Sequence, residues 1–306
     1  MPHIRPATPD DADTLAALVH AAYLGQFPVH PEQYRTANPA PGHLHLVAAQ
    51  GHDVTAAVHI TPFGERAPRA ARLQFAGDHA QYAALYTAAL THLPSGTRTL
   101  ISVVREDHTP QRAFLDAAAF RNAHQSWGAH LDLRTFNPDA HRALDERRYL
   151  EGYEIARLTH PAPAPTWAAL HALTLEAVRD APRNPTTTPD DLTPETLRAT
   201  VEREEQVWVA TYRNEITGFT RLTPRGTHAE SELTAVTRAH RRRGLATLLK
   251  MHALTWARTQ GLTSAGTGGN VHNLPMLRVN ARLGYRVEPM WITYTRDMPG
   301  HGNSDA

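Results

Sequence analysis

Apolar and polar positions follow a pattern along the chain that repeats at the scale of a whole domain. In the first half, short apolar runs typical of strands lie at 71–75, 99–104 and 127–133. Between them, at 82–93 and 110–119, apolar residues recur every three or four positions, as on one face of a helix. The pattern predicts alternating strands and helices.

The second half predicts the same order of elements. Strands are expected at 232–236, 262–267 and 291–295, and helices at 245–259 and 274–283. Such self-similarity indicates a duplicated unit. A single two-layer enzyme with chance periodicity is the alternative.

The spacing of equivalent residues favours the duplication. Leu100 and Leu262 are 162 positions apart, and Trp127 and Trp291 are 164 apart. The spacing is smaller near the starts of the two halves, which implies an insertion. We place the insertion in the Pro- and Thr-rich stretch 182–194.

Hairpins and crossover helices together define the expected fold class. Apolar runs flank turn residues at 51–53 and 213–215, as in hairpins. We therefore expect an α/β (α+β) protein with two tandem domains, each a mixed, mostly antiparallel sheet flanked by helices. The expected domains are 1–150 and 151–298, followed by a flexible tail at 299–306.

Composition excludes several classes of protein. The 31 basic and 30 acidic residues nearly cancel, so no global field would recruit nucleic acid or an acidic membrane. Cysteine is absent, which excludes disulfides and thiol nucleophiles, and the 20 histidines show no zinc-binding spacing. No apolar run approaches the roughly 20 residues that span a bilayer. We expect a soluble, cytoplasmic monomer or homodimer without a metal.

One segment combines a helix start with local positive charge. After the strand 232–236, three successive arginines at 241–243 precede Gly244 and the helix 245–259. The first turn of a helix offers unpaired N–H groups and a partial positive charge, which suit an anion. The segment is neither a P-loop nor a dinucleotide fingerprint. A solvated arginine cluster is the alternative.

This segment resembles the acyl-CoA loop of the GNAT N-acetyltransferase superfamily. The family pattern is Arg or Gln, two residues, Gly, one residue, then Gly or Ala, and Arg241, Gly244 and Ala246 match it. The tandem arrangement is similar to that of two-domain members such as mycothiol synthase. Further residues resemble the family's second cofactor segment: Thr267, Asn273, Met276, Asn280 and Leu283-Gly284-Tyr285.

The resemblance implies an N-acyltransferase. It would transfer an acetyl group from acetyl-CoA (coenzyme A) to a small-molecule or peptide primary amine by direct attack. A non-catalytic acyl-CoA-binding regulator is the alternative, and nucleic-acid or membrane binding is not expected. The expected cofactor-binding residues are Thr234, Ala235, Val236, Arg241, Arg242, Arg243, Gly244, Leu245, Ala246, Thr247, Asn273 and Asn280.

Acetyl transfer needs a base, because a free amine has a pKa of about 10. Strand periodicity predicts that Glu230, Glu232, Thr234 and Val236 share one face. The resemblance to mycothiol synthase points to Glu230 as the catalytic base, with Glu232 as the close alternative and His228 as a weaker one. The alternative is that Glu230 and Glu232 are exposed carboxylates of the strand without a catalytic role. The acidic run 202–205 is interpreted as a solvated helix face.

The chain departs from the family pattern in three places. Gly269 stands where the family's second cofactor segment has its first asparagine, with Asn270 one place later. Asn280 stands where many members carry a tyrosine that protonates the departing thiolate, so the general acid is open between water, Tyr285 and Tyr294. The first half lacks the arginine loop and carries Asp78 in the equivalent loop. We expect this degenerate domain, 1–150, to have lost cofactor binding and to shape the acceptor site or stabilise the pair.

Overall fold

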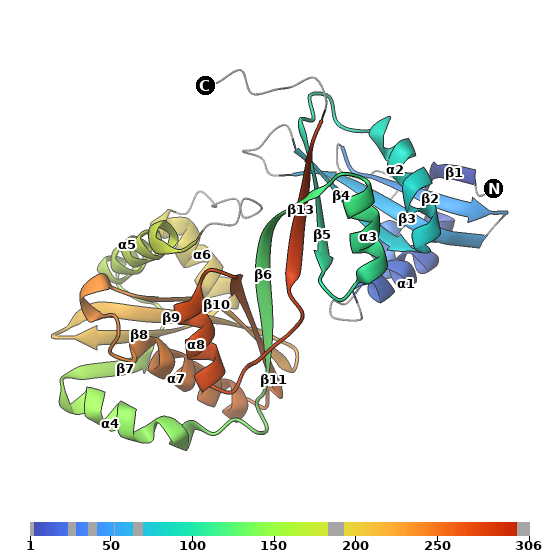
Figure 1. Ribbon diagram of the computed structural model, residues 1–306. Coiled ribbons are helices and arrows are strands. Elements are labelled where there is room, and N and C mark those ends of the chain that lie inside the picture. The colour runs from blue at the N-terminus through green and yellow to red at the C-terminus, as the bar shows by residue number, and fades with distance from the viewer. Residues whose placement is uncertain are drawn as a thin grey trace. The chain divides into compact units, whose positions relative to one another are not determined.

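The computed structural model describes residues 3–23, 29–35, 42–51, 53–63, 70–182 and 193–298. The tail at 299–306 and most of the insertion at 182–194 lie outside these ranges. The chain forms two compact units. Unit 1 comprises Met1–Gln125 and Pro289–Ala306, and unit 2 comprises Ser126–Glu288. Each unit has a mixed sheet flanked by helices, which confirms the fold class (Figure 1).

Unit 1 has a mostly antiparallel sheet, and among its described pairings β4 and β5 are the parallel pair. Leu85 and Phe114 belong to its main core with residues of the sheet, while Leu15 packs with Val47 elsewhere. The strands in spatial order are β1 (His3–Pro6), β2 (Leu44–Gln50), β3 (Asp53–Pro62), β4 (Ala70–Gly77), β5 (Thr99–Arg105) and β13 (Trp291–Asp297). The helices are η1 (Pro9–Asp11), α1 (Ala12–Ala22), η2 (Pro31–Tyr34), η3 (His79–Gln81), α2 (Tyr82–Leu90) and α3 (Thr109–Ala117).

Unit 2 repeats this plan, with β10 and β11 as its parallel pair. Helix α7 packs in one core, and α5 and α6 pack in a second core. The strands in spatial order are β6 (Arg121–Asp132), β11 (Ser264–Asn270), β10 (His228–Val236), β9 (Glu215–Arg225), β8 (Gln206–Tyr212) and β7 (Tyr153–Arg157), with β12 (Arg286–Val287) on β6. The helices are η4 (Pro138–His141), α4 (Arg142–Leu150), α5 (Ala164–Asp180), α6 (Pro194–Glu204), η5 (Arg238–His240), α7 (Leu245–Thr259) and α8 (Leu274–Arg282). Among the described helices, none is long and apolar enough to cross a membrane.

Each unit takes one strand of its sheet from the other half of the sequence. Residues 126–132 of β6 pair with β11 in unit 2, and β13 pairs along its whole length with β5 in unit 1 (Figure 1). The compact units therefore differ from the linear domains expected at 1–150 and 151–298. The cause is packing, since Trp127 fills the core of unit 2 and Tyr294 fills the core of unit 1.

Candidate active site

The parallel strands of unit 2 separate partway along their length. β10 and β11 pair from His228 opposite Ser264 to Ser231 opposite Thr267. Beyond that point the described pairings join β10 to β9 and β11 to β6. The two strands thus form a fork, and each turns one edge toward the opening. An extended ligand with amide groups can pair with such an edge as an added strand.

A β-bulge reverses the faces of β10 within the fork. The register against β9 shifts between Ser231 and Thr234, so three steps on β10 oppose two on β9. Ala229 packs in the core of α7, whereas Ala235 packs in the core of α5 and α6. The expectation that Glu230, Glu232, Thr234 and Val236 share one face is therefore wrong. The alternation of residues along a strand does not reveal the one extra residue of a bulge.

The two candidate catalytic carboxylates have different neighbouring residues. Glu230 Oε2 lies 3.3 Å from His228 Nε2, and His228 Nδ1 lies 2.8 Å from Ser264 Oγ. A Cβ at Gly266 would lie 2.5 Å from Glu230 Oε2, so the glycine makes room for this pair. Glu232 is exposed and accepts a hydrogen bond from the Thr223 hydroxyl at 2.9 Å. His228, the weaker candidate base, is thus the neighbour of Glu230.

A third carboxylate, that of Glu205, interacts with Glu232, and the sequence pattern did not single it out. Glu205 is only 7% exposed and pairs with Arg221 at 3.2 Å. Burial raises the pKa of Glu205, Arg221 opposes this rise, and Glu232 adds to it. The interpretation of 202–205 as a solvated face fails at Glu205, because the helix ends at Glu204 and strand β8 begins directly afterwards. The site is rich in carboxylates and therefore attracts cations.

The basic loop ends on an open helix start. Gly244 precedes α7 with a left-handed φ of 85°, and no side chain caps this end. A Cβ at Gly244 would also lie 2.9 Å from Leu144 Cδ2, so conformation and packing both demand glycine. Leu245 and Thr247 are buried and Ala246 is half-buried, so these residues can offer a ligand mainly their backbone N–H groups.

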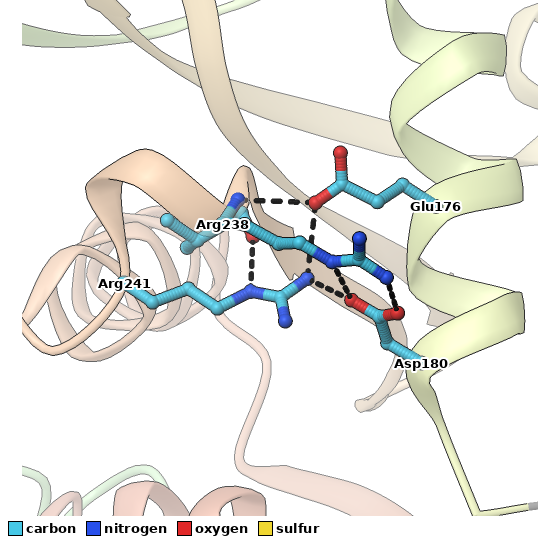
Figure 2. A network of polar contacts seen from close by, with 5 residues as sticks. Glu176, Asp180, Arg238 and Arg241 are labelled. Atoms are coloured by element: carbon cyan, nitrogen blue, oxygen red, sulfur yellow. Dashed lines mark hydrogen bonds and ion pairs between the residues drawn. The ribbon is translucent and has the colours of Figure 1, made fainter.

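The three arginines of the loop do not act together. Arg241 donates to the Val236 carbonyl at 2.9 Å and pairs with Glu176 at 3.1 Å and Asp180 at 2.7 Å. Arg238, which the sequence analysis did not single out, binds the same two acids of α5 (Figure 2). These arginines hold the pKa of Asp180 well below its usual range.

The remaining two arginines of the loop are exposed. The backbone carbonyl of Arg243 accepts a hydrogen bond from Arg148 at 2.6 Å, which ties the loop to α4. No hydrogen bond or ion pair of their own guanidinium groups is among those described. Arg242 and Arg243 are therefore the arginines whose side chains an anion can reach without displacing a carboxylate.

Helix α8 carries two asparagines with different surroundings. Asn273 caps the helix by accepting from the Met276 N–H at 3.4 Å. Asn280 is 1% exposed, and neither its Oδ1 nor its Nδ2 has a hydrogen-bond partner. A buried amide without partners is rare in folded proteins and suits a site that a polar ligand completes. Asn280 is therefore a buried amide whose hydrogen-bonding groups are free for a further partner.

Lys250 occupies the protein interior beside the fork, and the sequence analysis missed this as well. Its Nζ donates to Ser231 Oγ at 2.9 Å and lies 5.2 Å from the centre of the Tyr285 ring. Burial lowers the pKa of Lys250 to about 7, which the Glu230 carboxylate partly opposes. Burial raises the pKa of Tyr285. Tyr294, the other candidate acid, belongs to the core of unit 1.

Comparisons with known proteins extend this description. Residues 170–285 match the family model described as "Acetyltransferase (GNAT) family". No curated protein matches the chain.

Among solved structures, a GCN5-related N-acetyltransferase from Sphaerobacter thermophilus superposes with a TM-score of 0.67 at 16% identity, over 99% of this chain and 98% of that one. A tandem GNAT protein from the clavulanic acid biosynthesis pathway gives 0.61 at 19% identity, over 98% and 100%. At these identities, the likenesses show the fold.

The family match and the structural likeness describe different extents of the chain. The family match extends from within α5 to the residues just after α8 and thus contains the fork, the basic loop and Asn280. The solved structures cover both units. Residues 170–285 therefore resemble the GNAT acetyltransferase family, and the fold of the chain is similar to that of the solved GNAT structures.

Proposed function

We propose that this protein transfers an acetyl group from acetyl-CoA to a primary amine by direct attack. The observation that carries the proposal is the fork between β10 and β11, from which β10 leads through the basic loop to the uncapped start of α7. The fork offers strand edges to a chain of amides, and the helix start offers N–H groups to a pyrophosphate.

The binding roles follow from these positions. Backbone groups of Thr234, Ala235 and Val236 would pair with the pantetheine amides. Backbone N–H groups of 244–247 would hold the pyrophosphate, with Arg242 and Arg243 adding charge. Asn280 would complete its hydrogen bonds with the ligand.

Two carboxylates are available for proton removal. Bound acetyl-CoA would supply an acyl group activated as a thioester. Glu230 would take the proton of the incoming ammonium directly or through a water, while His228 orients the carboxylate. Glu232 is the alternative base. Together with Glu205, these carboxylates favour a cationic acceptor such as an amine.

The experiment combines calorimetry with an amine panel. The wild type should bind coenzyme A and acetylate at least one primary amine. Glu230→Gln should retain coenzyme A affinity and lose turnover by about 10²–10⁴-fold, the contribution of a general base. Glu232→Gln gives the same comparison for the alternative base, and the exposed Glu154→Gln on β7 is the matched control.

The outcomes separate the candidate functions. Coenzyme A binding without turnover on any amine would favour a non-catalytic acyl-CoA-binding regulator, which the asparagine at position 280 also suits. Absence of coenzyme A binding would refute both functions.

A further inference from the structure

The chain contains a single lysine, and that lysine is buried. Every other residue among the 31 basic residues is arginine, and Lys250 is 2% exposed. An arginine side chain keeps its proton at any physiological pH, whereas a buried lysine can lose it. The one lysine of the chain therefore lies in the interior of unit 2, within the range that matches the family model.

The contacts of Lys250 lead to the apex of the fork. Its Nζ donates to the Ser231 hydroxyl, and Ser231 is the last residue of β10 that pairs with β11. On the other side, Nζ faces the ring of Tyr285. Among the described residues, no carboxylate forms an ion pair with Lys250, and Glu230 on β10 is the charged group that acts on it. A hydroxyl and an aromatic ring hold the ammonium in place.

The neighbouring groups are poor sources of a proton. The amide of Asn280 holds no acidic proton, and burial raises the pKa of Tyr285. Tyr294 belongs to the sheet of unit 1. A general acid works best when its pKa lies near the working pH. Burial lowers the pKa of Lys250 to about 7. Lys250 is therefore the group at this apex that is best suited to release a proton.

We propose that Lys250 supplies, through Ser231, the proton that the departing thiolate needs. The inference rests on the proposed acetyl transfer. As the amine nitrogen bonds to the acyl carbon, the carbon–sulfur bond breaks and its electron pair stays on sulfur. Ser231 Oγ passes its proton to sulfur and receives one from Lys250 Nζ. An ammonium acceptor loses its first proton through Glu230 to water before the attack, and Glu230 then takes the second proton from the attacking nitrogen. Water then returns a proton to Lys250 and takes one from Glu230, so the cycle balances.

The single lysine permits a direct measurement. Protein labelled with [¹⁵N]lysine should show one side-chain NMR signal, whose pH titration has a midpoint near 7. Coenzyme A should raise this midpoint, because a thiolate near Ser231 favours the ammonium. Desulfo-coenzyme A, which lacks the thiol, should leave the midpoint unchanged. A purely structural lysine would respond to both compounds alike.

Kinetics provide the second test. Turnover of the wild type should fall at pH values above the Lys250 midpoint, because the acid must be protonated. Lys250→Met and Ser231→Ala should each lower kcat about 10- to 100-fold and lose this alkaline decline. The double variant should be no worse than either, since both residues act in one relay. Met251→Leu, buried on the same helix, is the matched control and should leave kcat unchanged.

Each result has a defined meaning. If coenzyme A binds but its thiol does not move the lysine midpoint, or if Lys250→Met keeps the alkaline decline and a kcat within twofold, the role of Lys250 is overturned and acetyl transfer stands. If coenzyme A does not bind, both proposals are overturned. If a variant is too unstable for kinetic measurements, the NMR comparison decides the role of Lys250, because it uses only wild-type protein.

Discussion

Lys250 shows how one side chain can link the stability of the fold to pH. Its pKa is about 7 in the folded chain, against an ordinary 10.5, and burial is the main cause. Between these two values, the unfolded chain binds the proton and the folded chain does not. The free energy of unfolding therefore rises as the pH increases from about 7 to about 10.5, and the full cost of the buried charge is present below pH 7.

Lys250→Met should accordingly stabilise the protein at acidic and neutral pH. We expect a gain of about 1–4 kcal/mol at pH 6, because methionine fills the site without a buried charge. The gain should shrink between about pH 7 and 10, where the wild-type lysine becomes neutral in the fold. Denaturant unfolding at several pH values measures the difference. A gain that does not change with pH would contradict this linkage.

At individual residues, the sequence predicted local backbone roles better than the burial of side chains. It placed Gly244 at a helix start, because local turn geometry depends on neighbouring residues. It missed the burial of Glu205 and Lys250. Burial depends on which elements pack together, and nothing in the local pattern around either residue encodes that.

At the scale of elements, α5 sets the charge of the basic loop. Glu176 and Asp180 hold Arg238 and Arg241 (Figure 2), so two carboxylates stand beside the site expected for a pyrophosphate. The sequence predicted the arginines but not these partners, which come from a helix more than fifty residues earlier in the chain. The acids lower the positive potential that an anion meets at the loop.

Asp180→Asn should therefore tighten the binding of coenzyme A. We expect an increase of about 2- to 10-fold at low salt and a smaller one at high salt, because the removed repulsion is screened. Glu176 retains its contacts with Arg238 and Arg241, so the loop should keep its place. Calorimetry at two salt concentrations measures the change, with the exposed Asp139→Asn as control. Weaker binding would show that Asp180 serves chiefly to order the loop.

A pair of histidines gives the strands of unit 1 their own pH dependence. His45 on β2 and His59 on β3 are cross-strand partners whose rings stack 3.8 Å apart. Burial lowers the pKa of His45 to about 4 and that of His59 to about 3. Repulsion from His43 adds to both shifts, and His45 and Arg72 add to the shift of His59. The unfolded chain, with histidine near 6.5, therefore binds more protons between about pH 4 and 6.5, and stability falls as the pH drops.

His59→Phe should reduce this acid sensitivity while it keeps a stacked ring. The melting temperature of the wild type should fall more steeply than that of the variant between pH 7 and 5. Differential scanning calorimetry across this range makes the comparison, and Lys250 contributes equally to both proteins. Parallel curves would mean that the imidazoles remain accessible to protons in the fold.

The whole molecule departs most from what the sequence predicted. The order and approximate bounds of the elements could be predicted from periodicity, and α7 begins and ends as expected. The pairing partners of β6 and β13 could not be predicted, because the two strands carry similar patterns and suit either sheet. The order of elements along a chain does not record an exchange of equivalent strands between duplicated units.

The exchange predicts how the chain can be divided. The fragment 151–306 lacks β6, so β11 loses its edge partner, and the core of unit 2 loses Trp127 and Leu131. The fragment 1–150 lacks β13, and the core of unit 1 loses Ile292 and Tyr294. Neither fragment should show a cooperative thermal transition by circular dichroism. The fragment 126–288 keeps the helices and the other strands of unit 2 together with the residues of β6 that pair with β11, and it should unfold cooperatively.

Co-expression of the two linear fragments provides the control. Together they contain every strand, so they should associate, restore both exchanged pairings and co-purify as a complex that melts near the full-length chain. The free energy for this association comes from the apolar side chains that β6 and β13 each bury in a core formed mainly by the other fragment. Cooperative unfolding of isolated 151–306, with no transition in 126–288, would show instead that each half folds within its own sequence and that β6 and β13 are not exchanged.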